Sequence, residues 1–243
     1  MSAGLAALEN GSDVEILEKA PEKLSGGNTK YTAGAMRFCF EGMDDLFPLL
    51  KNQEDDRLKN TDFGSYSREA FSNDLLSFND GRPLSDEQKI LVDESYDAIR
   101  WLSNHNVKFD PIYDRQSFKK NGRHVFWGGL ALSAANEGIG LFDQEKHAFL
   151  KLGGKIHYDT AVTSIAHHDG QVTGLFADEK YYSADAVVLA TGGFEANDQM
   201  RAEFIGENWR HAKVRGTPHN TGDGLRMAFS LGAKKYGFFG GCH

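Results

Sequence analysis

The chain has 243 residues and a formal net charge of −8, from 27 Lys and Arg against 35 Asp and Glu. Such an acidic chain argues against a nucleic-acid partner, because phosphate binding depends on clustered Lys and Arg. The 40% hydrophobic composition is that of a globular protein, and no apolar run approaches the roughly 20 residues that span a bilayer. With no leader pattern, and with two cysteines (Cys39 and Cys242) that lack metal-binding spacing, we expect a cytoplasmic protein without a metal site.

The N-terminal half alternates between helical and extended patterns. Residues 1–11 predict a helix with Leu and Ala on its apolar face, and residues 13–18 predict a buried strand that ends at Glu18. A glycine-rich loop over 22–38 comes next. Apolar residues at helical spacing then predict four helices, over 41–52, 67–79, 86–105 and 142–152.

The C-terminal part of the chain changes to a strand pattern. Residues 155–183 predict an antiparallel meander with a hairpin turn at Asp169-Gly170. The apolar run Val187 to Ala190 predicts a strand buried on both faces, and helices follow over 197–204 and 222–231 before a short terminal strand. This order predicts a Rossmann-like, doubly wound α/β sheet with an inserted β-meander.

Two stretches near the N-terminus bear on a ligand. Glu18 ends a strand where dinucleotide folds place an acid that accepts hydrogen bonds from ribose, about 20 residues after a glycine fingerprint. Gly4 lies too close to serve, so we expect the fingerprint, and the strand that carries it, before Met1. The loop "SGGNT", Ser25 to Thr29, has glycines whose N–H groups can face a pyrophosphate. A solvated strand end and a surface loop are the alternative interpretations.

The other two stretches are glycine bends. Thr191-Gly192-Gly193 follows the apolar run at the carboxyl end of the predicted strand, where doubly wound sheets bind ligands. Gly222-Asp223-Gly224 begins an amphipathic helix, whose N-terminus offers free N–H groups and partial positive charge. An ordinary tight turn and a helix capped by Asp223 are the alternatives at these two places.

Taken together, these stretches resemble the FAD-binding domain of the succinate dehydrogenase/fumarate reductase flavoprotein family. The residues that carry the resemblance are "EILEKAP", "SGGNT" with "TAGAM", "DAVVLATGGF" and "NTGDGLRMA". Within the family, "RGTPHNTGDGLRMA" with the terminal "GGCH" is similar to the FAD-dependent tricarballylate dehydrogenases. The resemblance implies FAD as the cofactor and a dehydrogenase acting on the CH–CH bond of a di- or tricarboxylic acid, such as tricarballylate to cis-aconitate.

The resemblance also implies which residues contact FAD and substrate. The implied cofactor contacts are Glu18 and Lys19 at the ribose; Ser25, Gly26, Gly27, Asn28 and Thr29 along the pyrophosphate and flavin; Val162 at the adenine; Ala190, Thr191, Gly192 and Gly193 near the diphosphate; and Thr221, Gly222, Asp223 and Gly224 near the isoalloxazine ring. His243 is implied as the catalytic histidine that holds a substrate carboxylate.

The family pattern is only partly present. We expect residues 1–243 to form one partial FAD-binding domain, with the meander inserted at about 155–183 and without the capping domain or its proton-transferring arginine. The substrate is expected to be a small carboxylic acid, and an electron-accepting partner is compatible with this chemistry. Its carboxylates need cations, for which the candidates are Arg37, Arg123, Lys213, Arg215, His219 and His243.

Other functions stay open at this point. A fumarate-reductase-like or ketosteroid-dehydrogenase-like flavoenzyme fits the same motifs. An inactive truncated fragment of such an enzyme, or a nucleotide-binding module without catalytic activity, also fits them.

Overall fold

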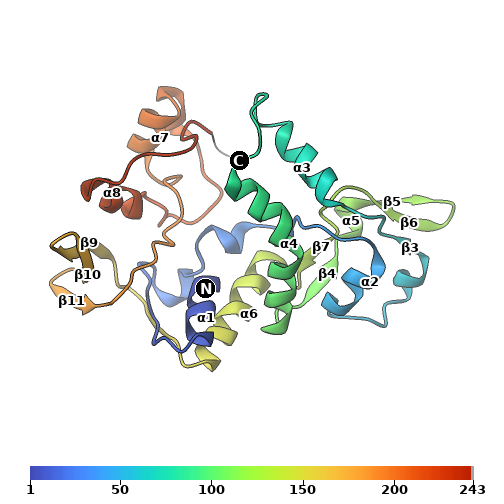
Figure 1. Ribbon diagram of the computed structural model, residues 1–243, viewed down its shortest axis with the longest axis horizontal. Coiled ribbons are helices and arrows are strands. Elements are labelled where there is room, and N and C mark those ends of the chain that lie inside the picture. The colour runs from blue at the N-terminus through green and yellow to red at the C-terminus, as the bar shows by residue number, and fades with distance from the viewer. Residues whose placement is uncertain (242–243) are drawn as a thin grey trace. The chain divides into compact units, whose positions relative to one another are not determined.

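The computed structural model describes residues 1–241, which form two compact units (Figure 1). Unit 1 is Met1–Tyr31 with Phe149–His243, and unit 2 is Thr32–Ala148. Both units combine helices with small sheets of parallel and antiparallel strands, so the expected mixed α/β class is confirmed. Within residues 1–241, no helix combines the length and the apolar character needed to cross a membrane.

Unit 1 begins with the predicted helix and strand. Its elements are α1 (Ser2–Glu9), β1 (Glu15–Leu17), η1 (Glu22–Leu24), η2 (Gly27–Tyr31), β8 (Lys155–His157), β9 (Val162–His168), β10 (Gln171–Ala177), β11 (Lys180–Ser183), α7 (Asp198–Phe204), η5 (Glu207–His211) and α8 (Asp223–Ser230). β1 pairs in parallel with β8, with Ile16 opposite Ile156. The close packing of α1 requires Gly4, because a Cβ there would lie 2.8 Å from the ring of Phe149.

The predicted meander is confirmed as the antiparallel sheet β11-β10-β9. Asp169 and Gly170 both have positive φ, of 49° and 78°, which gives the hairpin the mirror-image turn that suits twisted strands. The neighbouring His168 is exposed at this tip with Asp169, as a solvated turn would be.

The strand predicted over Val187 to Ala190 is wrong. Residues 184–190 belong to no strand, and Val188 is 71% exposed. None of the strands in residues 1–241 pairs with this run, and an extended segment without a ladder partner has no sheet in which to bury its side chains. The terminal strand is also wrong, because residues 231–241 contain none.

Unit 2 contains the long predicted helix. Its elements are β2 (Ala35–Met36), α2 (Met43–Leu46), η3 (Phe47–Leu49), η4 (Asp56–Asn60), β3 (Thr61–Asp62), α3 (Arg68–Leu76), α4 (Asp86–Asn104), β4 (Phe109–Pro111), α5 (Tyr113–Gln116), β5 (Ser117–Lys120), β6 (Arg123–Phe126), β7 (Leu132–Ala134) and most of α6 (Glu137–Lys151). α4 begins with a capping box, in which Ser85 and Gln88 satisfy each other's backbone N–H groups. The helix predicted over 41–52 is shorter, because Pro48 directs the chain into a 3₁₀ turn.

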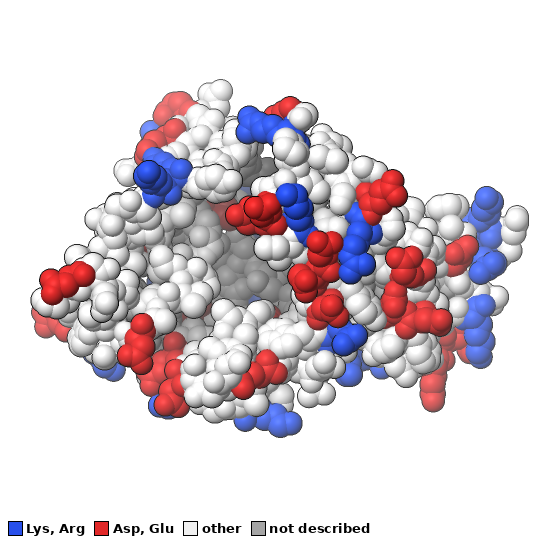
Figure 2. Space-filling model, in the orientation of Figure 1, with Lys and Arg blue, Asp and Glu red and all other residues white. Residues whose placement is uncertain are grey.

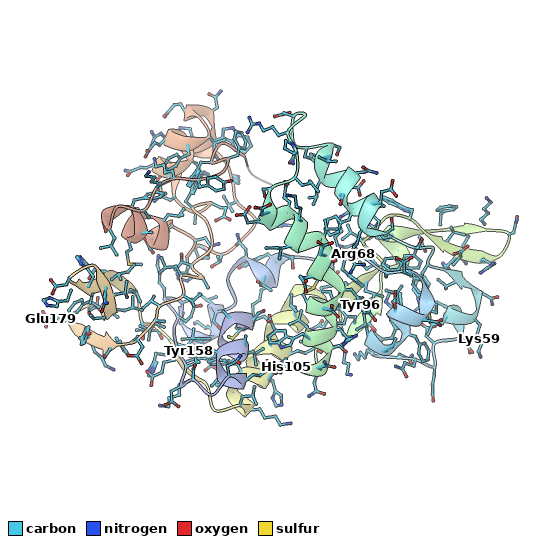
Figure 3. All side chains as sticks on the ribbon, in the orientation of Figure 1. Lys59, Arg68, Tyr96, His105, Tyr158 and Glu179 are labelled. Carbon is cyan, nitrogen blue, oxygen red and sulfur yellow. The ribbon has the colours of Figure 1, made fainter. Side chains whose placement is uncertain are left out.

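A continuous apolar core holds unit 2 together. Phe38, Phe40 and Phe109 are all but fully buried in it, together with Leu46 and Leu132. Polar contacts join the helices around this core, and Figure 3 labels two of the residues involved. Tyr96 on α4 donates a hydrogen bond of 3.1 Å to the Asp45 carbonyl, and Arg68 on α3 donates one of 3.2 Å to the Asp93 carbonyl. Acidic side chains gather on the surface over α2 (Figure 2).

Candidate functional site

The carboxyl end of β1 turns sharply at Glu18. The Glu18 carboxylate accepts a hydrogen bond of 2.7 Å from the Ala20 N–H through Oε1, which stabilises the turn. Its backbone N–H donates to the His157 carbonyl of β8, so the position of Glu18 is set by the parallel pair. Oε2 has no hydrogen-bond partner among residues 1–241 and remains available to a hydroxyl group.

Lys19 joins this turn to the second glycine bend. Its ammonium group lies 2.6 Å from Asp223 Oδ2 and 2.7 Å from Thr221 Oγ1, and it donates a third hydrogen bond of 3.3 Å to the His219 carbonyl. Asp223 also pairs with Arg226 one turn along α8. The strand end and the start of α8, more than 200 positions apart in the chain, are therefore in direct contact.

These contacts set the charge of Asp223. Burial raises the pKa of this carboxyl group, but hydrogen bonds from Lys19 and Thr221 and the charges of Lys19 and Arg226 outweigh burial, so its pKa lies below the usual value. Asp223 does not cap α8, since Gly222 is the N-cap and no side chain caps that helix end. The cap suggested as the alternative for this aspartate is therefore wrong.

The two glycine bends contact each other directly. The Gly222 N–H donates to the Gly193 carbonyl at 3.1 Å, and the Ala196 N–H donates to the Asn220 carbonyl at 2.9 Å. A Cβ on Gly224 would lie 2.1 Å from Thr191 Oγ1, so only glycine allows this approach. Gly224 is thus required for the packing of the protein itself, whatever ligand lies over the bends.

The "SGGNT" loop contacts residues near both glycine bends through the Asn28 side chain. The Asn28 side chain accepts a hydrogen bond of 2.9 Å from the Thr217 N–H and donates one of 3.3 Å to Glu195 Oε1. Asn28 itself lies within the 3₁₀ helix η2. Ser25 is 1% exposed, and its hydroxyl donates to the Glu22 carbonyl at 2.7 Å, so the side chain is used to shape the loop.

The loop nevertheless leaves backbone open. Gly27 has φ of +53°, and a Cβ there would meet nothing within 4 Å. Thr29 follows in η2, whereas Gly26, with φ of +107°, packs against the Lys30 side chain. The space beside Gly27 is therefore open, and its contact with a pyrophosphate stays a prediction.

Two buried polar atoms beside the bends lack partners. Glu195 Oε2 and His219 Nε2 are buried and have no hydrogen bond within the described part of the chain. Such atoms are costly to bury unless something binds them. Together with the open face of Gly27, they fit a polar ligand with hydroxyl groups and phosphates, as FAD is.

The remaining predicted site residues are more scattered. Val162 begins β9, a strand that contacts α8, and Ala190 lies in the exposed run before the first bend. His243 lies outside the described residues. Of the candidate cations, Lys213, Arg215 and His219 belong to unit 1, whereas Arg37 and Arg123 belong to unit 2. Residues 1–241 contain no group of His, Cys, Asp and Glu that could hold a metal ion.

Three residues of the network were missed from the sequence. Glu195 and Asn197 directly follow the first bend, and their polar side chains were the signal that could have marked them. Asn197 accepts a hydrogen bond from the Met200 N–H at 3.0 Å and donates one to the Thr221 carbonyl at 3.0 Å. Arg201 gave no signal, because an arginine on a short helix is normally exposed, whereas this one is only 8% exposed.

Known proteins resemble this chain along most of its length. Vinyl phenol reductase of Lactiplantibacillus plantarum is 26% identical over 97% of this chain and 44% of its own length. The protein named probable fumarate reductase Ifc3, of Shewanella frigidimarina, is 26% identical over 96% of the chain and 37% of its length. The chain therefore spans less than half the length of these relatives.

Solved structures agree with the sequence relatives. The open conformation of a flavocytochrome c3 fumarate reductase superimposes with a TM-score of 0.69 at 25% identity, covering 96% of this chain and 38% of that one. The model of one family, described as the FAD binding domain, matches residues 1–238. This chain therefore belongs to the FAD binding domain family, whose cofactor is FAD.

Proposed function

We propose that this chain forms the FAD-binding part of an FAD-dependent oxidoreductase that acts on a CH–CH bond. One observation carries the proposal: in unit 1 the turn after β1 and both glycine bends contact one another, so one extended molecule can reach all three. The names of the relatives support the reaction, because vinyl phenol and fumarate each contain a carbon–carbon double bond that a reductase can convert to a single bond.

Each predicted contact has a definite role in this proposal. Glu18 Oε2 accepts hydrogen bonds from the ribose hydroxyls, while Oε1 stays bound to the Ala20 N–H. The open backbone of Gly27 and the N-terminus of α8 face the phosphates and the flavin ring. When bound, FAD would supply the two-electron acceptor for the removal of two hydrogens from adjacent substrate carbons.

The proposed substrate is a di- or tricarboxylic acid, with oxidation of tricarballylate to cis-aconitate as the specific reaction. Lys213 and Arg215 support this choice, because both are exposed just before the second bend and neither has an acidic partner within residues 1–241. His243 is proposed to hold a substrate carboxylate. A reductase working in the opposite direction, on fumarate, is the second candidate, which the flavocytochrome similarity favours. A cytoplasmic location and an electron-accepting partner complete the proposal.

Titration of the purified 243-residue chain with FAD tests the cofactor site. We expect the chain to purify without yellow colour and then to quench the fluorescence of added FAD. Glu18→Gln should weaken binding of both FAD and ADP about tenfold, because both contain the ribose. Asp13→Asn, at an exposed acid just before β1, is the matched control and should change neither dissociation constant.

The same titration separates the alternatives. Equal affinity for ADP and FAD would contradict flavin recognition and support a nucleotide-binding module. Tricarballylate, succinate and fumarate are then added to the FAD-loaded chain while its visible spectrum is recorded. A spectral change with tricarballylate but not with an uncharged analogue of it supports the carboxylic acid substrate, and identical responses to both would contradict it.

A further inference from the structure

Arg201 is a buried cation without an acidic partner. It lies on α7 and is only 8% exposed, yet none of its N–H groups contacts a carboxylate in the described part of the chain. Burying a charge is costly unless hydrogen bonds compensate it. The guanidinium group of arginine also keeps its charge in proteins, so Arg201 is not neutralised by losing a proton. A reason for keeping it at this position is therefore needed.

Backbone carbonyl groups supply the compensation. Arg201 Nε donates to the Trp209 carbonyl at 2.8 Å, and Nη2 donates to the carbonyls of Arg210 at 2.7 Å and Ala212 at 3.4 Å. Nη1 donates to the Glu195 carbonyl. The guanidinium group thus joins the residues just after the first glycine bend to the segment 209–212, which leads toward the second.

The residues next to the Glu195 carbonyl that Arg201 binds also make hydrogen bonds between the two bends. Glu195 is two residues beyond Gly193, whose carbonyl accepts the Gly222 N–H. Ala196 and Asn197 then donate to the carbonyls of Asn220 and Thr221, at 2.9 and 3.0 Å. Two of these three bonds therefore start from Ala196 and Asn197, which directly follow the Glu195 carbonyl that Arg201 binds.

The neighbouring contacts leave little tolerance for a shift. Met200, the residue before Arg201, lies so close to Gly222 that a Cβ there would be 2.4 Å from its sulfur. A displacement of α7 would therefore move the second bend as well. Glu195, whose carbonyl Arg201 binds, also carries the buried and unpaired Oε2.

We propose that Arg201 is a positioning residue, which holds the two glycine bends in the relative position that FAD requires. It touches neither cofactor nor substrate and acts through the Glu195 carbonyl and the 209–212 segment. This inference rests on the proposed role of the two bends in FAD binding, and it adds the residue that keeps them together.

Amide hydrogen exchange on the full chain tests the inference. In Arg201→Met, the amides of Ala196 and Gly222, which bridge the bends, should exchange about tenfold faster or more, the factor expected from losing one charge-assisted hydrogen bond. Amides of the β9–β10 hairpin, in the same unit, should keep their rates. Uniform acceleration throughout unit 1 would show that Arg201 is merely structural and would overturn the proposal.

Two further variants keep the test decisive. Arg201→Lys retains the charge but offers one ammonium group in place of the planar guanidinium, so it should restore part of the protection, and it replaces the Met variant if that one fails to fold. Arg210→Met is the matched control, because within residues 1–241 the Arg210 side chain pairs with Glu207 alone. Faster exchange at Ala196 in this control, or full protection in Arg201→Lys, would contradict the geometry argued here.

The FAD titration links the inference to function. The dissociation constant should increase from the unaltered chain through Arg201→Lys to Arg201→Met. Equal constants for all three would overturn the cofactor role of Arg201. If the unaltered chain fails to bind FAD while the exchange pattern appears as expected, the proposed function fails, and the positioning of the bends by Arg201 is still supported.

Discussion

The two units are stabilised in different ways. Unit 2 has a continuous core rich in aromatic side chains, with Phe38, Phe40 and Phe109 almost fully buried. Among the described residues of unit 1, Phe149 is the one buried aromatic side chain, and buried polar residues take a larger share. Arg201, Thr217 and Asn220 are buried there beside the glycine bends.

This difference follows from what each part of the sequence must do. Apolar burial is non-directional and tolerates modest changes of shape, so it suits a unit that only needs to be stable. Hydrogen bonds and close backbone contacts are directional, and they suit bends whose relative position decides ligand binding. Substitutions in unit 2 should therefore change stability most, and substitutions in unit 1 should change the geometry of the bends.

The largest effect is expected in the core of unit 2. Phe109→Ala removes a fully buried ring between β4 and its neighbours, which should lower the free energy of unfolding by about 3–5 kcal/mol. Phe78→Ala, at a site 84% exposed in the same unit, is the control and should cost less than about 0.5 kcal/mol. Urea denaturation followed by tryptophan fluorescence measures both, and similar losses would contradict the core described here.

A glycine bend of unit 1 should come next. Gly222→Ala places a side chain on a residue with φ of +78° and against the Met200 sulfur, and it should cost about 2–4 kcal/mol. Gly11→Ala separates the cost of the positive φ from that of the close contact, because Gly11 has φ of +82° but open space around it. Its loss should be only about 1 kcal/mol, measured by the same denaturation. Equal losses would show that the close contact with Met200 carries no energy.

Sequence reasoning succeeded where local chemistry decides the structure. The helix predicted over 86–105 and the turn at Asp169-Gly170 depend on residues a few positions apart, and both are confirmed. It failed for Val187 to Ala190, because a strand forms only when another strand pairs with it, and that depends on distant parts of the chain.

The candidate site was predicted in the same uneven way. The glycine bends and Glu18 were recognised because special residue types mark them. The Lys19–Asp223 pair and the contacts of Arg201 join residues through space, which no local pattern records. What the sequence supplied was thus the list of backbone bends, and what the structure adds is the set of side chains that joins them.

Ionisation of Tyr66 at alkaline pH should lower the stability of unit 2 by an intermediate amount. Tyr66 is 4% exposed and donates a hydrogen bond to Asp74 at 2.6 Å. Burial and this bond raise the pKa of Tyr66 to about 12 although Arg37 opposes the shift. In the unfolded chain the Tyr66 hydroxyl ionises near pH 10. Its contribution of about 2 kcal/mol to stability is therefore fully present below pH 10 and is lost between pH 10 and 12.

Comparison with Tyr66→Phe isolates this contribution. The variant should lose less stability than the unaltered chain between pH 10 and 12, because other groups titrate equally in both. Absorbance at the tyrosinate band should also show one tyrosine fewer titrating near pH 12. An identical pH dependence in the two proteins would contradict the raised pKa of Tyr66.

A smaller effect, of opposite sign in pH, is expected at Asp223 in unit 1. Its lowered pKa means that its ion pair with Lys19 stabilises the fold above the unfolded pKa near 4, and that this stability is lost as the pH falls through the folded value. Asp223→Asn should therefore cost about 1 kcal/mol at pH 7 and progressively less as the pH falls through the folded pKa. Asp185→Asn, at an exposed acid of the same unit, is the control. A loss for Asp223→Asn that does not shrink as the pH falls would contradict the electrostatic origin.

The smallest change in stability is expected at Val188, in the apolar run for which the sequence wrongly predicts a strand. Val188 is 71% exposed, so Val188→Ser should change the free energy of unfolding by less than about 0.5 kcal/mol. Val107→Ser, at a fully buried valine of unit 2, should cost about 2 kcal/mol or more because it loses apolar burial and leaves a hydroxyl in the core. Denaturation of both variants compares the stability lost at a valine of unit 1 with that lost at a valine of unit 2. A loss at Val188 as large as that at Val107 would mean that the apolar run is buried as its pattern predicts, and that unit 1 has a core of its own beside its polar network.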